Sequence, residues 1–214
     1  MKIAGIRREL SASSLSSLTI EDHETCPTPP LSCFQPVSSS EIKRFITSLK
    51  TKSCQLDPIP TWILKGCINQ LLPTITEIIN SSLEQGHFPS KLKESIVYLL
   101  LKKPALDLED NNNFRPISDL SFPSKTLERI SAVQLDNHLT GHQLYAKMQS
   151  AHRKYHSTES ALLKVFNDIN TAIDNPHECL LVLLDLSAAS DTIHHKILIN
   201  LLENKYGISG LALE

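Results

Sequence analysis

The sequence CLLVLLDLSAASD, residues 179–191, gives the most specific indication of the fold. Six apolar residues precede Asp185, and a run of this length predicts a buried β-strand at 179–184. The small residues that follow Asp185 leave room for a ligand to approach the backbone. A strand that delivers a carboxylate to the end of a sheet is typical of sites that hold divalent ions for phosphoryl transfer. The alternatives are a capping or turn role for Asp185 and a helix N-cap role for Asp191.

Helices are predicted over much of the remaining chain from capping residues, glycine and proline. Three serines at 38–40 precede an apolar 3–4 period that begins at Ile42, which predicts an amphipathic helix with a serine N-cap. Pro60 predicts the first turn of a second helix, and Gly86 predicts the C-cap of a third over 71–85. Further helices are expected at 124–139, 157–173 and 193–205 (the last stopped by Gly207), with a short one at 2–10. The inward faces are expected to be Ile75, Ile78, Ile79, Ser82 and Leu83 in the third helix, and Leu127, Ile130, Val133 and Leu135, with Gln134 less regular, in 124–139.

Two strands and two irregular segments complete the prediction. SIVYLLL, residues 95–101, is rich in β-formers and predicts a short strand. KKPALDLEDNNNFRPIS, residues 102–118, contains an Asn run and two prolines, so we expect a loop without regular structure. Residues 11–36 are rich in Ser, Thr and Pro and predict an exposed linker. The strand at 179–184 needs sheet partners, and residues 95–101 are one candidate.

The composition excludes several classes of protein. Hydrophobic residues make up 41% of the 214 and charged residues 21%, which is ordinary for a globular chain. No apolar run approaches the roughly 18 residues that span a bilayer, and the N-terminus lacks the apolar core of a signal peptide, so we expect a cytosolic or nuclear protein and no membrane partner. The five cysteines contain no C-x-x-C pair, which disfavours a disulfide framework or a zinc site. His194 and His195 are adjacent and make a poor metal pair.

A net charge of −2 argues mildly against a nucleic-acid-binding protein, but local basic clusters remain. One cluster runs from Lys91 through Lys102 and Lys103 to Arg115, and Pro116 beside Arg115 suits a fixed, fork-like phosphate contact. Another follows Gln149 and includes Arg153 and Lys154, near a helix N-terminus of the kind that binds phosphates. A solvated surface and an ordinary capping box are the alternatives.

The order of the motifs is more specific than any one of them. LDPIPTWILK, FPSKLKESIVYLLLKKP, NNNFRPISDLSFPSKTLERI, QSAHRKYHSTESALL and LLVLLDLSAASDTIHHKIL follow one another between residues 56 and 198. In this order they resemble successive segments of the reverse transcriptase of a LINE-type (non-LTR) retrotransposon, nearest to the chicken-repeat and jockey-like branches. The resemblance covers residues 38–213, and KIAGIRREL resembles the stretch that precedes the polymerase in such reading frames.

The resemblance implies an α+β, predominantly helical fold: a partial right-hand polymerase. Residues 1–37 would be an N-terminal segment and linker, and 38–214 the start of the polymerase, with an N-terminal extension and fingers up to about 175 and the first palm strand and helix after it. Its partners would be an RNA template, a DNA primer and deoxynucleoside triphosphates, and its cofactor Mg²⁺. The roles implied are catalysis and metal binding for Asp185, metal binding for the carbonyl of Leu186, nucleotide binding for Lys102, Lys103, Arg115 and Ser190, and template binding for Gln149 and Arg153.

Three features depart from the family pattern. The aromatic-Ala-Asp-Asp motif that carries the other catalytic carboxylates is absent from these 214 residues, so we expect truncation within the palm and no activity from this chain alone. Ser190 stands where the family has an aromatic residue under the sugar. Ala151-His152 replaces a Gly-aromatic pair, which predicts strain if the turn needs positive φ. The alternative is a degenerate, non-enzymatic remnant with at most RNA-binding capacity.

Overall fold

The computed structural model describes residues 28–52, 54–175, 177–186 and 193–214. They are mostly helical with a small two-stranded sheet, as the predicted fold class required. They divide into two compact units, each described here by itself: residues 28–142 with 199–214, called the helical unit, and residues 143–198, called the 143–198 unit. The helix expected at 2–10 lies outside the described residues. No helix in the described part is long and apolar enough to cross a membrane.

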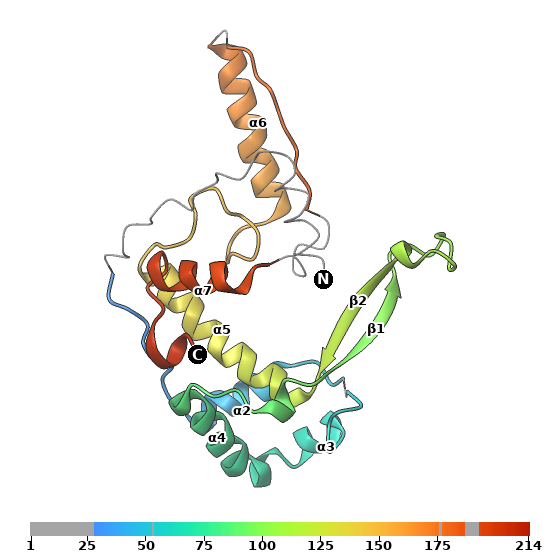
Figure 1. The fold of residues 1–214 in the computed structure, drawn as a ribbon, viewed down its shortest axis with the longest axis vertical. Helices are drawn as coiled ribbons and strands as arrows, with labels where there is room; N and C mark the ends of the chain where they lie inside the picture. Colours follow the sequence, from blue (N-terminus) through green and yellow to red (C-terminus); the bar gives the residue numbers. More distant parts are fainter. Residues whose placement is uncertain (1–27, 53, 176, 187–192) are drawn as a thin grey trace. The chain divides into compact units, whose positions relative to one another are not determined.

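Helices α2 (Ser39–Ser48), α4 (Ile68–Gln85) and α5 (Phe122–Gly141) enclose the core of the helical unit (Figure 1). The predicted serine cap of α2 is confirmed: the Ser38 hydroxyl accepts a hydrogen bond from the Glu41 amide, and the Glu41 carboxylate accepts one from the Ser38 amide. This capping box satisfies donors that the first turn leaves unpaired. Ile42 and Ile46 are fully buried where α2 packs against α4 and α5. Short α3 (Thr61–Gly66) begins after Pro60, as predicted, and packs against α4.

The inward faces of α4 and α5 are confirmed in part. Ile79, Leu83, Leu127 and Ile130 belong to the core. Ile78 and Val133 are 50% and 40% exposed, so their predicted burial is wrong: they sit at the edge of the apolar stripe and not at its centre. Gly86 ends α4 with φ 62°, the left-handed C-cap expected from the sequence.

Residues 31–37 are attached to the helical unit and do not form the exposed linker expected there. The Gln134 side chain accepts a hydrogen bond from the Gln35 amide and donates one to the Gln35 carbonyl. Asn80 makes the same pair of bonds to Val37. Each amide side chain thereby pairs with both backbone groups of one residue, as a neighbouring strand would. The prolines of this segment had favoured a linker and gave no sign of this pairing.

The sheet consists of β1 (Ser95–Leu101) and β2 (Phe114–Leu120), paired antiparallel. β1 coincides with the predicted strand, but the loop expected at 102–118 is wrong from Phe114 onward. Hydrogen-bonded pairs alternate in such a ladder. Because Lys102 N donates to Asn113 O, the Leu99–Pro116 pair falls at a non-bonded position. Pro116 therefore costs the ladder nothing, since its missing N–H would point outward. A short 3₁₀ turn, η2 (Asn111–Asn113), leads into β2.

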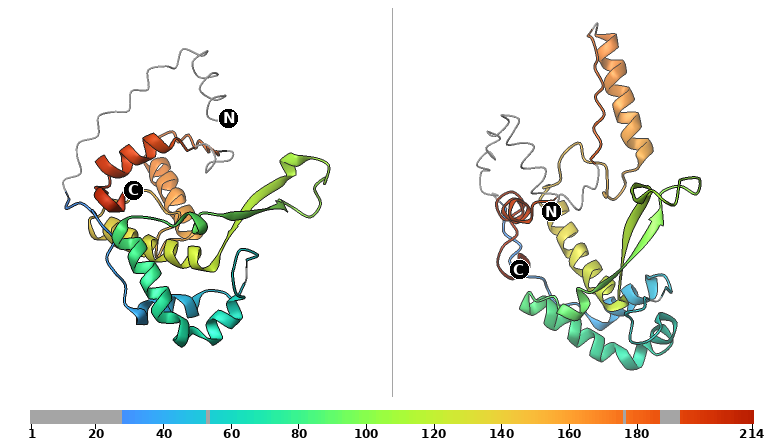
Figure 2. Two further views of the ribbon diagram at one scale, coloured as in Figure 1. Left: turned by 60° about the horizontal axis from the view of Figure 1, so that its bottom comes forward. Right: turned by 45° about the vertical axis from the view of Figure 1, so that its right-hand side comes forward.

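The remaining elements lie at either side of the Asp185 motif. α6 (Thr158–Asp174) has the predicted Ser157 N-cap, and α7 (His195–Asn204) ends before Gly207, which has φ 65°. Residues 177–186 form no strand, so the strand predicted at 179–184 is wrong for the described residues. They run back beside α6 (Figures 1 and 2). A strand needs an adjacent strand, and among the described residues β1, the partner suggested for it, is paired with β2 alone.

Candidate functional site

The β1–β2 ribbon brings two of the predicted nucleotide-binding residues onto one face. Arg115 lies opposite Leu100, and Lys102 lies opposite Asn113. These two cross-strand pairs are both hydrogen-bonded and lie two residues apart along the ribbon. The side chains of Lys102 and Arg115 therefore project from the same face, as diagonal neighbours. The loop prediction could not have placed Lys102 and Arg115 together, because only the pairing of β2 with β1 sets their spacing.

Lys102 and Arg115 on this face, and Lys103 next to it along the chain, are exposed and available to a ligand. Lys102 Nζ donates to the Asn112 carbonyl at 2.6 Å, which holds the ammonium near the ribbon tip. Arg115 and Lys103 are exposed, and neither side chain makes a hydrogen bond or ion pair with another described residue. A guanidinium beside an ammonium on a two-stranded ribbon can take a polyanion such as a triphosphate by charge-assisted bonds.

Carboxylates fix the base of the ribbon to the helices. The Asp57 carboxylate accepts hydrogen bonds from the amides of Cys54 (2.7 Å) and Phe122 (2.6 Å), so it joins the turn before α3 to the start of α5. Asp119 at the end of β2 pairs with Lys125 of α5 at 2.6 Å. The Lys125 hydrogen bond lowers the pKa of Asp119. No anchoring role was predicted for Asp57; an aspartate before a proline was the available signal for this anchor.

The predicted template-binding residues are neighbours in one loop of the 143–198 unit. Arg153 Nη1 donates to the Gln149 carbonyl at 3.3 Å, and the guanidinium lies 5.0 Å from the centre of the Tyr145 ring. The Gln149 side chain donates to the Ala151 carbonyl at 3.2 Å, so in this conformation it folds back on its own loop. The arginine is thus held in place, whereas the glutamine must rotate to reach a ligand.

The same loop contains left-handed backbone, but the strain predicted at Ala151 is not found there. Gln143, His152 and Tyr155 have φ of 56°, 57° and 63°. These values lie in the left-handed region, where a non-glycine residue costs about 1–2 kcal/mol. The nearest of the three to Ala151 is His152, the next residue along the chain.

Asp185 and Leu186 lie at the end of an exposed segment. Leu184 and Leu186 are 90% and 77% exposed, and Asp185 between them is exposed as well. Within the described part of the chain, no group of three or more His, Cys, Asp or Glu side chains could hold a metal ion. One carboxylate and one carbonyl do not fit a two-magnesium site, which needs several carboxylates. Ser190 lies outside the described residues.

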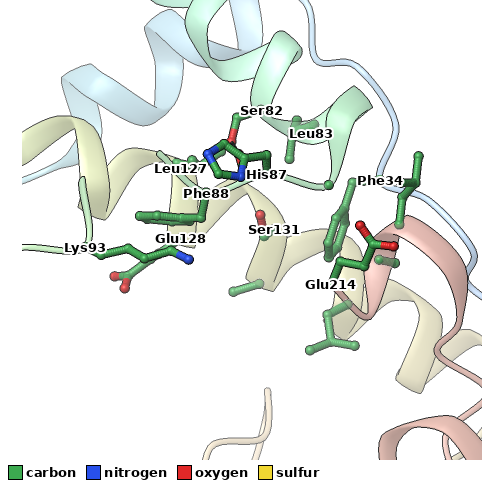
Figure 3. Close-up of a pocket in the computed structure, with 15 residues that line it drawn as sticks. Phe34, Ser82, Leu83, His87, Phe88, Lys93, Leu127, Glu128, Ser131 and Glu214 are labelled. Carbon is green, nitrogen blue, oxygen red and sulfur yellow. Dashed lines mark hydrogen bonds between the residues drawn. The ribbon is translucent and has the colours of Figure 1, made fainter. Parts of the chain in front are cut away.

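A cavity of about 500 Å³ lies in the helical unit, between the end of α4, α5 and residues 211–214 (Figure 3). Its floor is apolar and includes Leu83, Leu127 and Phe88. Lys93 and Glu128 lie on one side of it and Glu214 on another (Figure 3). Partial burial raises the pKa of Glu128. No sequence signal predicted this cavity, because its walls come from four segments far apart in the chain.

Comparison with known proteins identifies relatives of this chain but no matching family model. The probable RNA-directed DNA polymerase from transposon BS of Drosophila melanogaster is 27% identical over 186 residues, which cover 85% of this chain and 20% of that protein. The probable RNA-directed DNA polymerase from transposon X-element of the same species is 28% identical over 166 residues, 78% of this chain and 18% of that protein. The RNA-directed DNA polymerase from mobile element jockey of Drosophila funebris is 28% identical over 164 residues, 75% of this chain and 18% of that protein.

These relatives confirm the resemblance drawn from the motifs. The curated homologues are RNA-directed DNA polymerases of non-LTR retrotransposons. The chain spans about a fifth of the length of the relatives it matches.

Proposed function

We propose that this chain is the fingers and the beginning of the palm of a retrotransposon reverse transcriptase, with an N-terminal segment at 1–37 and the partial polymerase domain at 38–214. The observation that carries the proposal is the ribbon face on which Lys102 and Arg115 are diagonal neighbours. A polymerase needs such a pair where the triphosphate of the incoming nucleotide is gripped. The similarity to RNA-directed DNA polymerases supports deoxynucleoside triphosphates as the proposed ligand of this face.

The other site residues take roles consistent with their surroundings. Arg153, held over Tyr145, and Gln149 beside it bind the RNA template in this proposal. Asp185 and the Leu186 carbonyl would hold part of the shell of one Mg²⁺, which would supply charge neutralisation for phosphoryl transfer, and they do not complete a two-ion site. Ser190, which lies outside the described residues, is proposed as part of the nucleotide site on the resemblance alone. Because the described residues supply a single carboxylate there, we assign no catalytic step to residues 1–214.

Triphosphate binding tests the ribbon. We expect a fluorescent deoxynucleoside triphosphate to bind the purified chain, and Arg115→Gln or Lys102→Gln to weaken binding roughly tenfold, because each removes a charge-assisted contact. Lys164→Gln in α6 is the matched control, since it removes one positive charge outside the ribbon, and its affinity should equal that of the parent. Equal weakening in all three variants would assign the binding to net charge and contradict the proposal.

A second candidate is a non-enzymatic remnant that binds RNA, and what favours it is that no group of three or more metal-binding side chains is found among the described residues, where Asp185 is the one carboxylate of its motif. Primer extension on an RNA template separates the two. We expect no extension by residues 1–214 with Mg²⁺, and salt-sensitive RNA binding that falls when Lys102, Lys103 and Arg115 are all replaced by glutamine. Extension that is lost in Asp185→Ala would show a complete active site and refute the remnant.

A further inference from the structure

Tyr155 combines two properties that seldom occur together. Its side chain is 90% exposed, and its backbone is left-handed with φ 63°. Left-handed backbone is a genuine outlier for a bulky residue, and such residues gather at ligand-binding sites. Exposure leaves no burial to offset the cost of this conformation, so packing within the chain does not explain why a tyrosine is held here.

One face of the Tyr155 ring is covered by a neighbouring cation. Lys154 Nζ lies 5.0 Å from the centre of the ring, in the geometry of a cation–π contact. An ammonium over one face leaves the opposite face open in a side chain this exposed. A flat, open aromatic face with a cation behind it matches the stacking platforms on which nucleic-acid-binding proteins hold unpaired bases.

The surrounding loop has the charge that such a platform needs. Residues 143–157 contain Lys147, Arg153 and Lys154 and no aspartate or glutamate, in a chain whose net charge is −2. The Arg153 guanidinium is held at 5.0 Å from the Tyr145 ring and bonds the Gln149 carbonyl, so it is positioned before any ligand arrives. Fixed and mobile cations beside an aromatic ring favour a phosphodiester strand over an apolar protein partner.

We propose that Tyr155 stacks on an unpaired base of a single-stranded nucleic acid, while Lys154 and Arg153 contact the neighbouring phosphates. The inference rests on the proposed reverse-transcriptase function, to which it adds a base-stacking residue. A duplex does not offer this contact, because its base faces are occupied by neighbouring bases. Stacking depends little on base identity or on the sugar, so RNA and DNA single strands should use Tyr155 alike.

Anisotropy of a labelled single strand of about 12 nucleotides tests this, with the intact chain and its variants at fixed salt. Tyr155→Ala should weaken binding roughly five- to 150-fold, and Tyr155→Phe should bind like the parent because it keeps the ring. Tyr155→Gly removes the ring and also suits left-handed backbone, so it should weaken binding as much as alanine does. Parent-like affinity in Tyr155→Gly would show that strain, and not stacking, caused the alanine effect, and would overturn the inference.

Three further arms separate stacking from charge and from the wider proposal. The slope of log affinity against log salt should be unchanged in Tyr155→Ala and smaller by about one in Lys154→Gln. Duplex RNA should bind parent and Tyr155→Ala equally, and a loss confined to RNA or to DNA single strands would point to a sugar contact and count against base stacking. If the parent binds single strands and Tyr155→Ala matches it, only this inference fails; if the parent binds no nucleic acid, the proposed function fails with it.

Discussion

Helices α5 and α6 begin in the same way and end in different environments. Each follows a serine N-cap and carries leucine, isoleucine or phenylalanine at helical spacing. In α5, Leu127 and Ile130 are 2% and 1% exposed, because α2 and α4 cover them. In α6, Leu163 and Phe166 are 71% and 61% exposed, and none of its residues is buried. The same local signal forms both helices, but only a facing surface converts an apolar stripe into a core.

The two helices should therefore respond very differently to the same chemical change. Leu127→Ala should lower the free energy of unfolding by about 2–5 kcal/mol, since it removes buried methyl groups and leaves a cavity. Leu163→Ala should change it by less than about 0.5 kcal/mol. Urea denaturation followed by circular dichroism measures both. Comparable losses would mean that α6 has an apolar partner in solution, and sedimentation would then identify self-association.

Residues 207–212 pack against the end of α4, as part of the helical unit. Alanine substitutions at two glycines, Gly86 and Gly66, test this packing. A Cβ at Gly86 would lie 2.6 Å from the Leu211 carbonyl oxygen, and Gly86 also has φ 62°. Gly86→Ala should cost about 2 kcal/mol of stability, from the left-handed penalty and the clash. Gly66→Ala in α3 is the control: a Cβ there meets nothing within 4 Å, and it should be neutral or slightly stabilising. Thermal melting of both variants decides whether residues 207–212 are packed on the end of α4.

A smaller effect is expected where the ribbon joins the helical unit. The Lys125 hydrogen bond lowers the pKa of Asp119. At a pH between the lowered native pKa and the ordinary value, the native state therefore binds fewer protons than the unfolded chain. The stabilisation is present above the ordinary value of 3.8 and is lost as pH falls through the lower native pKa. For a partly exposed pair it amounts to at most about 1 kcal/mol.

Asp119→Asn should remove that part of the pH dependence. Denaturation at a series of pH values from 6 down to about 3 should give curves for parent and variant that differ above pH 4 and converge below it. Asp168→Asn, whose partner is Lys164 on exposed α6, is the matched control and should leave the pH profile unchanged. A parent profile that stays parallel to Asp119→Asn throughout would show that the ion pair contributes nothing to folding.

Local rules predicted the helices well and the site only in part. The Ser38, Ser157 and Gly86 caps were predicted because each depends on backbone groups within a few residues. β2 was missed because Pro116 and the preceding asparagines indicate a loop, and only the register against β1 shows that the proline is harmless. At residues 179–184 the error is the reverse, because a strand was predicted and none forms. The apolar pattern there is strong, but no strand lies beside it in the described part of the chain.

By itself, the sequence determined the helices, their caps and the order of motifs that links this chain to RNA-directed DNA polymerases. These depend on neighbours along the chain, where distances are fixed by covalent geometry. The tertiary structure decided what depends on distant segments: the β1–β2 register that places Lys102 beside Arg115, the attachment of residues 31–37, and the exposure of α6 and Tyr155. Burial and pairing need a second surface, and no local pattern specifies where that surface will be.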